Sequence, residues 1–242
     1  MELLSFDIEI AEEFTLAPGE DLDKYGPFHI TVAAIAFEAI ERHRWGTIWV
    51  STDPETLLPM PTMSPVQTQS LLHTLSCAQK EEGFDLCAWN GLGFDLRWIG
   101  WNALDPISAA LVALDHYDPM FQFFCQRGFP ISLAAVAKGM GIEQEKLMSG
   151  ADAPAAWREG EFDLVKKYVM GDAQMTNQVV RAIIDAGEIR WISKKGKLLK
   201  EPMPRLKTVR ECIAEPFTAD QSWMPNPLKK EKFYAWFPKG IL

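Results

Sequence analysis

The sequence predicts an α/β protein whose mixed sheet begins with a three-stranded antiparallel meander and has helices on both faces. Three observations predict this class. Strand-like segments fill the first 51 residues, a short buried strand follows the first helical segment, and helical patterns dominate the rest. The 242 residues are enough for one large domain or one domain with an appendage, since about 150 residues per domain is typical. Apolar residues (48%) and charged residues (24%) are in ordinary globular proportions.

The three opening strands are predicted from side-chain alternation and residue type. In residues 3–10, apolar side chains alternate with polar ones that include Asp7 and Glu9, so one face of the strand is apolar and the other anionic. Residues 28–38 and 44–51 are rich in β-branched and aromatic residues and flank a short polar turn. This pattern is typical of the next two strands of a meander.

Helical signals begin after residue 63. Ser64 and Pro65 are a helix N-cap and a first-turn proline, followed by an apolar-periodic run to about residue 80. Residues 84–89 are a short buried strand. Gly and Pro residues then separate further predicted helices at about 94–101, 106–117, 131–140 and 161–186. A small hairpin is predicted around residues 195–196.

Charge is distributed unevenly along the chain. Residues 1–189 contain 12 Lys and Arg against 28 Asp and Glu, a net charge of -16, whereas residues 190–242 contain 12 against 5, a net charge of +7. We therefore divide the chain into a domain at 1–186 and a small basic extension at 187–242, a hairpin plus a Pro- and aromatic-rich tail packed on that domain. The basic segment indicates either contact with a polyanion or a solvated lysine-rich surface.

Several protein classes are excluded by the sequence. The apolar runs fall well short of the roughly 20 residues that a membrane-spanning helix needs, and the amino-terminal residues have no basic flank typical of a secretory signal. We therefore expect no membrane partner and a reducing, cytoplasmic location. Neither a disulfide framework nor a structural zinc site is expected, because the cysteines lie far apart without CxxC spacing, at Cys77, Cys87, Cys125 and Cys212.

Two carboxylates of the first strand are candidate metal ligands. Asp7 and Glu9 lie two residues apart, so a strand places both on one face, roughly 7 Å apart along the backbone, where they can share a cation. By themselves they are equally compatible with the polar side of a half-exposed strand. The same Asp-x-Glu pattern recurs at Asp53 and Glu55, but there the surrounding loop provides no strand to orient the pair.

Two later segments carry further candidates. The sequence NGLGFD, which ends in Asp95, directly follows the buried strand, and ligand-binding side chains gather at strand ends in α/β sheets. Tyr168 and Asp172 lie four residues apart in a predicted helix, so they share one helix face about one turn apart. Taken alone, this second pair is also compatible with an incidental pair on a helix surface.

Together, the segments FDIE, NGLGFD and YVMGD, in this order and spacing, closely resemble the three motifs of the DEDD superfamily of 3'-5' exonucleases. The third motif is of the tyrosine type, because none of the four histidines has an Asp five residues later. The likeness is to the proofreading-exonuclease domain of family B DNA polymerases and to related stand-alone predicted exonucleases. It covers residues 1–186 and implies a ribonuclease H-like fold.

The resemblance implies a two-metal site. Asp7, Glu9, Asp95 and Asp172 would hold two divalent cations, with Tyr168 beside the attacking water. Hard oxygen ligands suit Mg²⁺ or Mn²⁺, and such a pair of ions can stabilise the attacking and leaving oxygens of a phosphoryl displacement. A phenol with an ordinary pKa of about 10 is a poor base near neutrality, so we expect Tyr168 to orient the water.

The resemblance also suggests residues that bind the nucleic acid. Asn90 and Phe94 would contact the terminal nucleotides, Phe94 by stacking or wedging against a base, although core packing explains a Phe at this position equally well. Asp118 is either a site residue or a turn starter before a proline. Arg97, one helical turn from Phe94, is either a phosphate contact or a surface arginine.

These observations predict a metal-dependent 3'-5' exonuclease. It would release nucleoside 5'-monophosphates, one at a time, from the 3' end of single-stranded DNA or RNA. Two alternatives use the same fold. One is a catalytically silent nucleic-acid-binding or scaffold domain, and the other is a structure-specific endonuclease.

Overall fold

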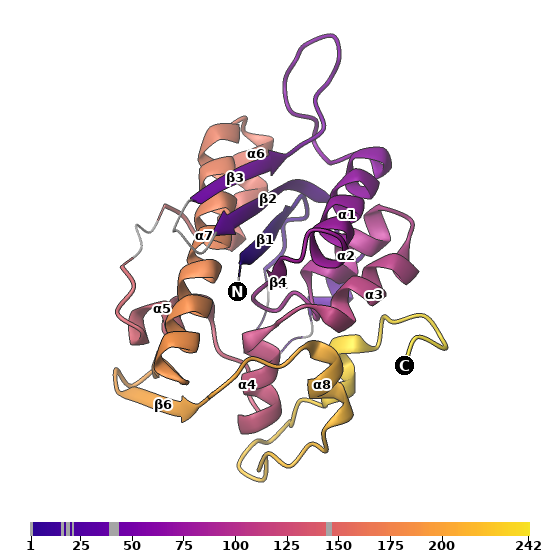
Figure 1. Cartoon of the computed structure of the whole chain (residues 1–242). Helices are drawn as coiled ribbons and strands as arrows, with labels where there is room; N and C mark the ends of the chain where they lie inside the picture. Colours follow the sequence, from indigo (N-terminus) through magenta and orange to yellow (C-terminus); the bar gives the residue numbers. More distant parts are fainter. Residues whose placement is uncertain (1, 16, 18–19, 21, 39–43, 144–146) are drawn as a thin grey trace.

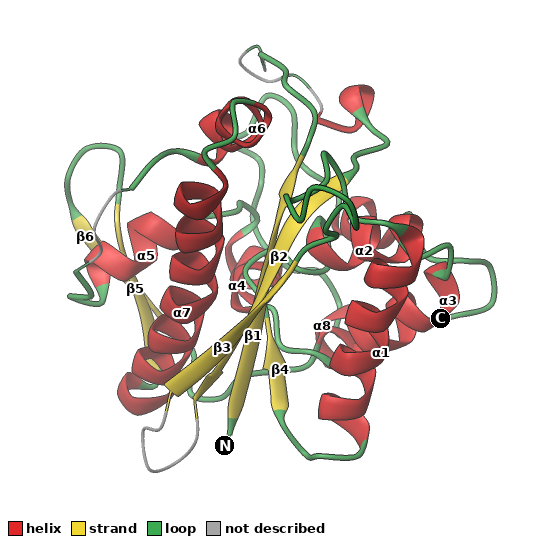
Figure 2. Cartoon of the chain, turned by 90° about the horizontal axis from the view of Figure 1, so that it is seen from above, coloured by secondary structure: helices red, strands yellow, loops and turns green. Residues whose placement is uncertain are grey.

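A four-stranded mixed sheet runs through the middle of the molecule, with helices on both faces, in the computed structural model of the chain (Figures 1 and 2). The strand order is β3-β2-β1-β4. β2 pairs antiparallel with β1 and β3, and β4 pairs parallel with β1. The predicted α/β class and opening meander are thus confirmed. The strands are β1 (Leu3–Ile10), β2 (Ile30–Glu38), β3 (Arg44–Trp49) and β4 (Asp85–Cys87).

The structure describes residues 2–15, 17, 20, 22–38, 44–143 and 147–242. The helices within these ranges are α1 (Pro65–Lys80), α2 (Asp95–Asn102), α3 (Pro106–Asp115), α4 (Pro119–Arg127), α5 (Leu133–Gly139), α6 (Ala153–Arg158), α7 (Phe162–Ala186) and α8 (Val209–Ala214). Short 3₁₀ helices are η1 (Leu22–Tyr25), η2 (Gly150–Asp152) and η3 (Lys230–Tyr234). No helix in these ranges is both long and apolar enough to span a lipid bilayer.

The two faces of β1 differ as the sequence alternation predicts. The apolar side chains of Leu4, Phe6 and Ile8 are buried in the core that α1, α2 and α3 cover. On the opposite face, the Ser5 hydroxyl donates a hydrogen bond to the Ala173 carbonyl of α7. Figure 2 shows α7 on one side of the sheet and α1 and α2 on the other. Asp7 and Glu9, which alternate with the apolar residues, therefore lie on the α7 side.

Helix starts follow local capping chemistry. Ser64 caps α1 by accepting a hydrogen bond from the Gln67 N–H, with Pro65 at the first position, as predicted. No sequence pattern predicts a helix at 119–127, yet α4 begins there, capped by Asp118. Its six residues from Pro119 to Phe124 are all buried, so α4 lacks the apolar-polar periodicity by which a helix is recognised in sequence.

The chain after α7 packs against the same cores as the first 186 residues. β5 (Glu188–Ile192) and β6 (Leu198–Pro202) form the predicted hairpin. Trp191 of β5 packs with Phe123 of α4, with ring centroids 5.0 Å apart. Beyond β4, the sheet continues as isolated bridges from Cys87 to Tyr117 and from Tyr117 to Thr208.

Candidate active site

Asp7 and Glu9 on β1 face a group of carboxyls from other elements. Burial raises the pKa of Asp7 well above its usual range, and the negative charges of Asp95, Glu9 and Asp172 raise it further. Burial likewise raises the pKa of Glu9, followed by the charges of Asp172 and Asp95. Each effect requires proximity, because Coulomb interactions fall with distance. The four predicted site carboxyls, which come from three distant segments, therefore lie within range of one another's charges.

Asp95 contributes a buried carboxyl at the first position of α2. Its side chain is only 3% exposed, and among the described residues its Oδ1 atom has no hydrogen-bond partner. Burial is the largest cause that raises the pKa of Asp95, to about 7. A buried carboxylate oxygen without a donor is costly, so this position favours either a proton or a cation beside it.

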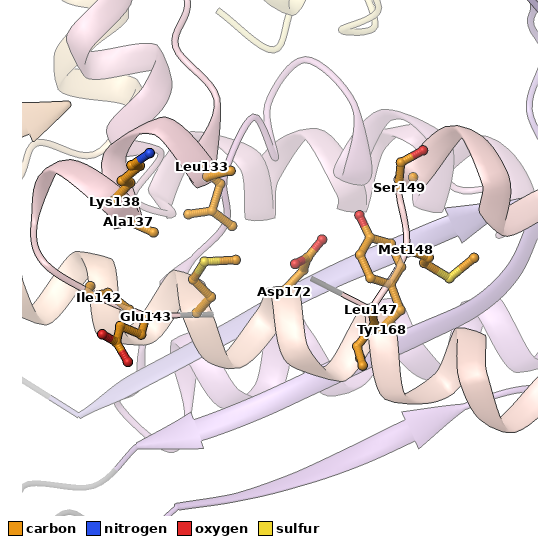
Figure 3. Close-up of a pocket in the computed structure, with 13 residues that line it drawn as sticks. Leu133, Ala137, Lys138, Ile142, Glu143, Leu147, Met148, Ser149, Tyr168 and Asp172 are labelled. Carbon is orange, nitrogen blue, oxygen red and sulfur yellow. The ribbon is translucent and has the colours of Figure 1, made fainter. Parts of the chain in front are cut away.

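Tyr168 and Asp172 project from one face of α7, as their four-residue spacing predicts (Figure 3). The Tyr168 hydroxyl is hydrogen-bonded to the Asp172 carboxylate. Burial raises the pKa of Tyr168 above its usual value, as do the negative charges of Asp172 and Glu9. Tyr168 is therefore a neutral phenol near neutrality, a hydrogen-bonding group rather than a base.

A hollow of about 770 Å³ lies beside this pair, and we call it the α5 hollow (Figure 3). α5 supplies one wall, through residues that include Leu133 and Lys138, and the segment from Leu147 to Gly150 supplies another. The Tyr168 hydroxyl lies 3.5 Å from where a Cβ at Gly150 would be. The α7 side of the site is thus open to a ligand.

The loop at residues 90–94, which we call the motif loop, is held from behind by Asp118. The Asp118 carboxylate accepts hydrogen bonds from the backbone N–H groups of Asn90 and Leu92, both at 3.1 Å, and from Phe121 at 3.0 Å. It is 1% exposed, and burial raises its pKa to about 6. Asp118 is therefore the N-cap of α4 and also a positioning residue for the loop that precedes Asp95.

The motif loop has a tightly defined backbone. Asn90 adopts a left-handed conformation with φ of 68°. A Cβ at Gly93 would lie 2.6 Å from the Asn90 Oδ1 atom and 3.1 Å from the Phe233 ring. A side chain at this position would therefore displace the Asn90 amide and press on the Phe233 ring. The loop shape therefore depends on a residue of the carboxy-terminal extension as well as on its own sequence.

Phe94 and Arg97 have partly structural roles. Phe94 is half-buried, and its ring centroid lies 6.0 Å from that of Phe28, so the predicted core packing is present. It also lines a second hollow, of about 380 Å³, which we call the loop hollow. Arg97 lines it too, but its guanidinium is paired with Asp23 at 2.7 Å and lies over the Trp98 ring. Leu228, Lys232 and Phe233 of the extension complete this hollow, which no local sequence pattern indicates.

The four carboxyl groups have the donor chemistry that hard divalent cations prefer. All candidate ligands are oxygen donors, and the Asp95 Oδ1 atom is buried without a hydrogen-bond donor among the described residues. Within those same residues, no three His, Cys, Asp or Glu side chains are grouped closely enough to hold an ion as they stand. Like charges 4 Å apart repel by about 4 kcal/mol at an effective dielectric constant near 20, a repulsion that a bound divalent cation would offset.

Compared with models of known protein families and with curated proteins, the sequence has no match. The features that bear on function are therefore the three motif segments and the way the fold arranges them.

Proposed function

We propose that this protein is a metal-dependent 3'-5' exonuclease of the DEDD superfamily, tyrosine subfamily, that acts on single-stranded DNA or RNA. The observation that carries the proposal is the meeting of Asp7, Glu9, Asp95 and Asp172, with Tyr168 hydrogen-bonded to the last of them. Oxygen ligands gathered in this way suit two Mg²⁺ or Mn²⁺ ions.

The sheet topology supports a ribonuclease H-like fold. An antiparallel meander leads into a parallel fourth strand, and β1, which carries Asp7 and Glu9, is an inner strand of the order β3-β2-β1-β4. The bridge from Cys87 to Tyr117 adds one more parallel pairing beyond β4. An inner strand is a rigid platform for ligands that must hold fixed positions.

Each residue of the site has a defined part in the proposed reaction. When bound, the two cations supply a nucleophilic water and neutralise charge on the phosphate. The carboxylates of Asp7, Glu9, Asp95 and Asp172 hold the cations, and the Tyr168 phenol orients the attacking water by hydrogen bonding. Water adds to phosphorus, and the bond to the 3' oxygen of the preceding nucleotide breaks. The products are a nucleoside 5'-monophosphate and a shortened strand with a 3' hydroxyl.

The proposal is tested with DNA and RNA oligomers labelled at the 3' or the 5' end, with Mg²⁺, with Mn²⁺ and with chelator. We expect 3'-labelled mononucleotide at the earliest times, a ladder from 5'-labelled strands, and no product with chelator. A circular single strand should remain intact. Cleavage of the circle would support the endonuclease instead, and binding without cleavage under any metal condition would support the silent nucleic-acid-binding domain.

A further inference from the structure

Different parts of the chain build two hollows, one beside the YVMGD segment and one beside the NGLGFD segment. The α5 hollow lies against Tyr168 and Asp172 of α7, and the loop hollow lies against Asn90 and Phe94, directly before Asp95. A phosphodiester bond that is cut has a nucleotide on each side. A nuclease that cuts between two nucleotides therefore needs room for chain on both sides of its acids.

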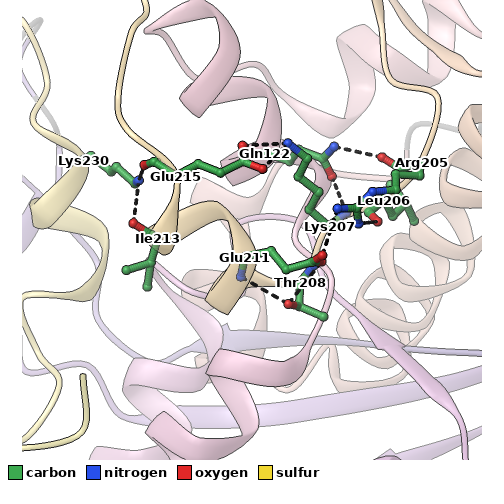
Figure 4. A network of polar contacts seen from close by, with 9 residues as sticks. All are labelled: Gln122, Arg205, Leu206, Lys207, Thr208, Glu211, Ile213, Glu215 and Lys230. Carbon is green, nitrogen blue, oxygen red and sulfur yellow. Dashed lines mark hydrogen bonds and ion pairs between the residues drawn. The ribbon is translucent and has the colours of Figure 1, made fainter.

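The extension forms a fixed wall of the loop hollow. Phe233 is 8% exposed and packs against Phe121 and Phe124, with ring centroids 5.2 and 4.7 Å away. The buried Lys230 Nζ donates hydrogen bonds to the carbonyls of Ile213, at 3.0 Å, and Glu215, at 2.7 Å (Figure 4). These carbonyls are at the carboxy-terminal end of α8, where a cation is favoured.

α8 is in turn held against α4. The Gln122 side chain of α4 donates to the Arg205 carbonyl, at 3.0 Å, and accepts from the Lys207 N–H, at 2.8 Å (Figure 4). Thr208 and Glu211 then form a capping box at the start of α8. The wall is therefore connected by hydrogen bonds to the helix that begins at Asp118, the residue that holds the motif loop.

The extension also contacts the motif loop directly. The Trp236 indole Nε1 donates a hydrogen bond to the Leu92 carbonyl, at 2.8 Å. Phe233 lies so close to Gly93 that a Cβ there would be 3.1 Å from the Phe233 ring. The extension and the loop that carries Asn90 and Phe94 thus form one surface.

The residues around the loop hollow suit an unpaired nucleotide. Lys232 is exposed and lines the hollow together with Asn90 and Phe94. The carboxylates of Glu20 and Asp23 also line it, and they form ion pairs with Lys24 and Arg97. An ammonium group beside a half-buried aromatic ring is the combination that contacts a phosphate while a base stacks. The hollow adjoins another, of about 640 Å³, through the shared residues Asp23 and Arg97, and the second one is lined by Trp98, Trp101 and Trp236. A strand can therefore continue beyond the first nucleotide.

Building on the exonuclease function proposed above, we propose that the loop hollow binds the nucleotides that precede the cleaved bond. In this arrangement Lys232 of the carboxy-terminal extension contacts a backbone phosphate. The extension is then part of the substrate-binding surface, and Lys232 affects how tightly a strand is held, while the acids determine how fast it is cut.

The test compares Lys232→Glu with Lys239→Glu, which makes the same charge change at another exposed lysine of the extension. The substrates are a 12-nucleotide oligothymidylate and the p-nitrophenyl ester of thymidine 5'-monophosphate, which has no upstream nucleotide. For Lys232→Glu we expect KM for the oligomer to rise about tenfold, with kcat for the ester unchanged. Lys239→Glu should match the wild type on both, and Lys232→Arg should retain the wild-type KM.

Binding without hydrolysis gives a second readout. In EDTA, fluorescence anisotropy of a labelled 12-mer should show weaker binding by Lys232→Glu. The slope of log K against log salt concentration should also become less steep by about 0.7, the value for one phosphate contact on a single strand. Equal oligomer KM and equal salt dependence for the Lys232→Glu and Lys239→Glu variants would overturn this assignment. A wild-type protein that cuts neither the oligomer nor the ester would overturn the exonuclease function itself.

Discussion

The two sides of the candidate site are built in different ways. On the α7 side, Asp7 and Glu9 share a strand face and Tyr168 and Asp172 share a helix face, so regular backbone geometry places their side chains. On the loop side, the backbone is irregular, and Asp118 together with the extension maintains its shape. The residues proposed for the chemistry thus lie on rigid elements, whereas the proposed positioning of a nucleic-acid strand depends on contacts distant in sequence.

The largest expected effect is on the α7 side. Asp172→Asn keeps the shape of the side chain but removes a charged oxygen ligand, so we expect kcat to fall by about 10³-fold or more. The control is Asp163→Asn, an exposed residue of the same helix, which should retain wild-type activity. Activity is measured on a 5'-labelled oligomer with Mn²⁺. Full activity of Asp172→Asn would contradict the assignment of Asp172 as a metal ligand.

On the loop side, Asp118→Asn should lower both stability and activity. An amide cannot accept hydrogen bonds from several N–H groups as a carboxylate does, so we expect a loss of about 2 kcal/mol in unfolding free energy. Because the motif loop shifts, activity should fall by roughly 10- to 100-fold. Asp105→Asn is the matched control, since Asp105 also caps a helix before a proline but holds no site loop. If both variants lose activity equally, Asp118 has no specific positioning role.

Tyr168→Phe separates orientation from ligation within the α7 side. The phenyl ring still packs, but the hydroxyl that is hydrogen-bonded to Asp172 is lost. We expect kcat to fall by about 10- to 100-fold with little change in KM, because the effect is on the attacking water. Tyr25→Phe removes a phenol bonded to Glu20 and should leave kcat unchanged. A Tyr168→Phe variant that changes only KM would instead indicate a role in binding the nucleic acid.

Without any substitution, the free energy of unfolding should depend on pH and on cations. The folded-state pKa of Asp95 is about 7, above its usual value of 3.8, so the folded protein binds more protons than the unfolded one between these values. With chelator, this contribution to stability is present below about pH 4 and is lost as the pH rises to about 7.

Divalent cations should counteract that loss. At about 100 times the dissociation constant, Mg²⁺ or Mn²⁺ adds about 2.7 kcal/mol, which corresponds to a rise of roughly 5–11 °C in melting temperature for a chain of this size. The measurement is thermal unfolding from pH 4 to 8, with cation and with chelator. The same melting curve in both conditions at pH 7.5 would contradict cation binding by these carboxyls.

Much of the fold follows from local patterns in the sequence. The opening strands, the long α7 and the hairpin occur where alternation, capping residues and turn residues predict them. Asp53 lies in a loop, as its sequence surroundings predict. Its carboxylate accepts hydrogen bonds from the backbone N–H groups of Glu55 and Thr56. The short helices α6 and α8 were not predicted, because one or two turns contain too few residues for a period to be detected.

The sequence alone determined which residues can share a face, because the periods of two and about 3.6 residues are properties of the backbone. It therefore paired Asp7 with Glu9 and Tyr168 with Asp172. Tertiary contacts, in contrast, bury Asp95 without a hydrogen-bond donor on one oxygen, place Asp118 behind the motif loop, and make the extension a wall of the loop hollow. Burial and long-range hydrogen bonds depend on which segments meet in space, and local sequence patterns do not contain that information.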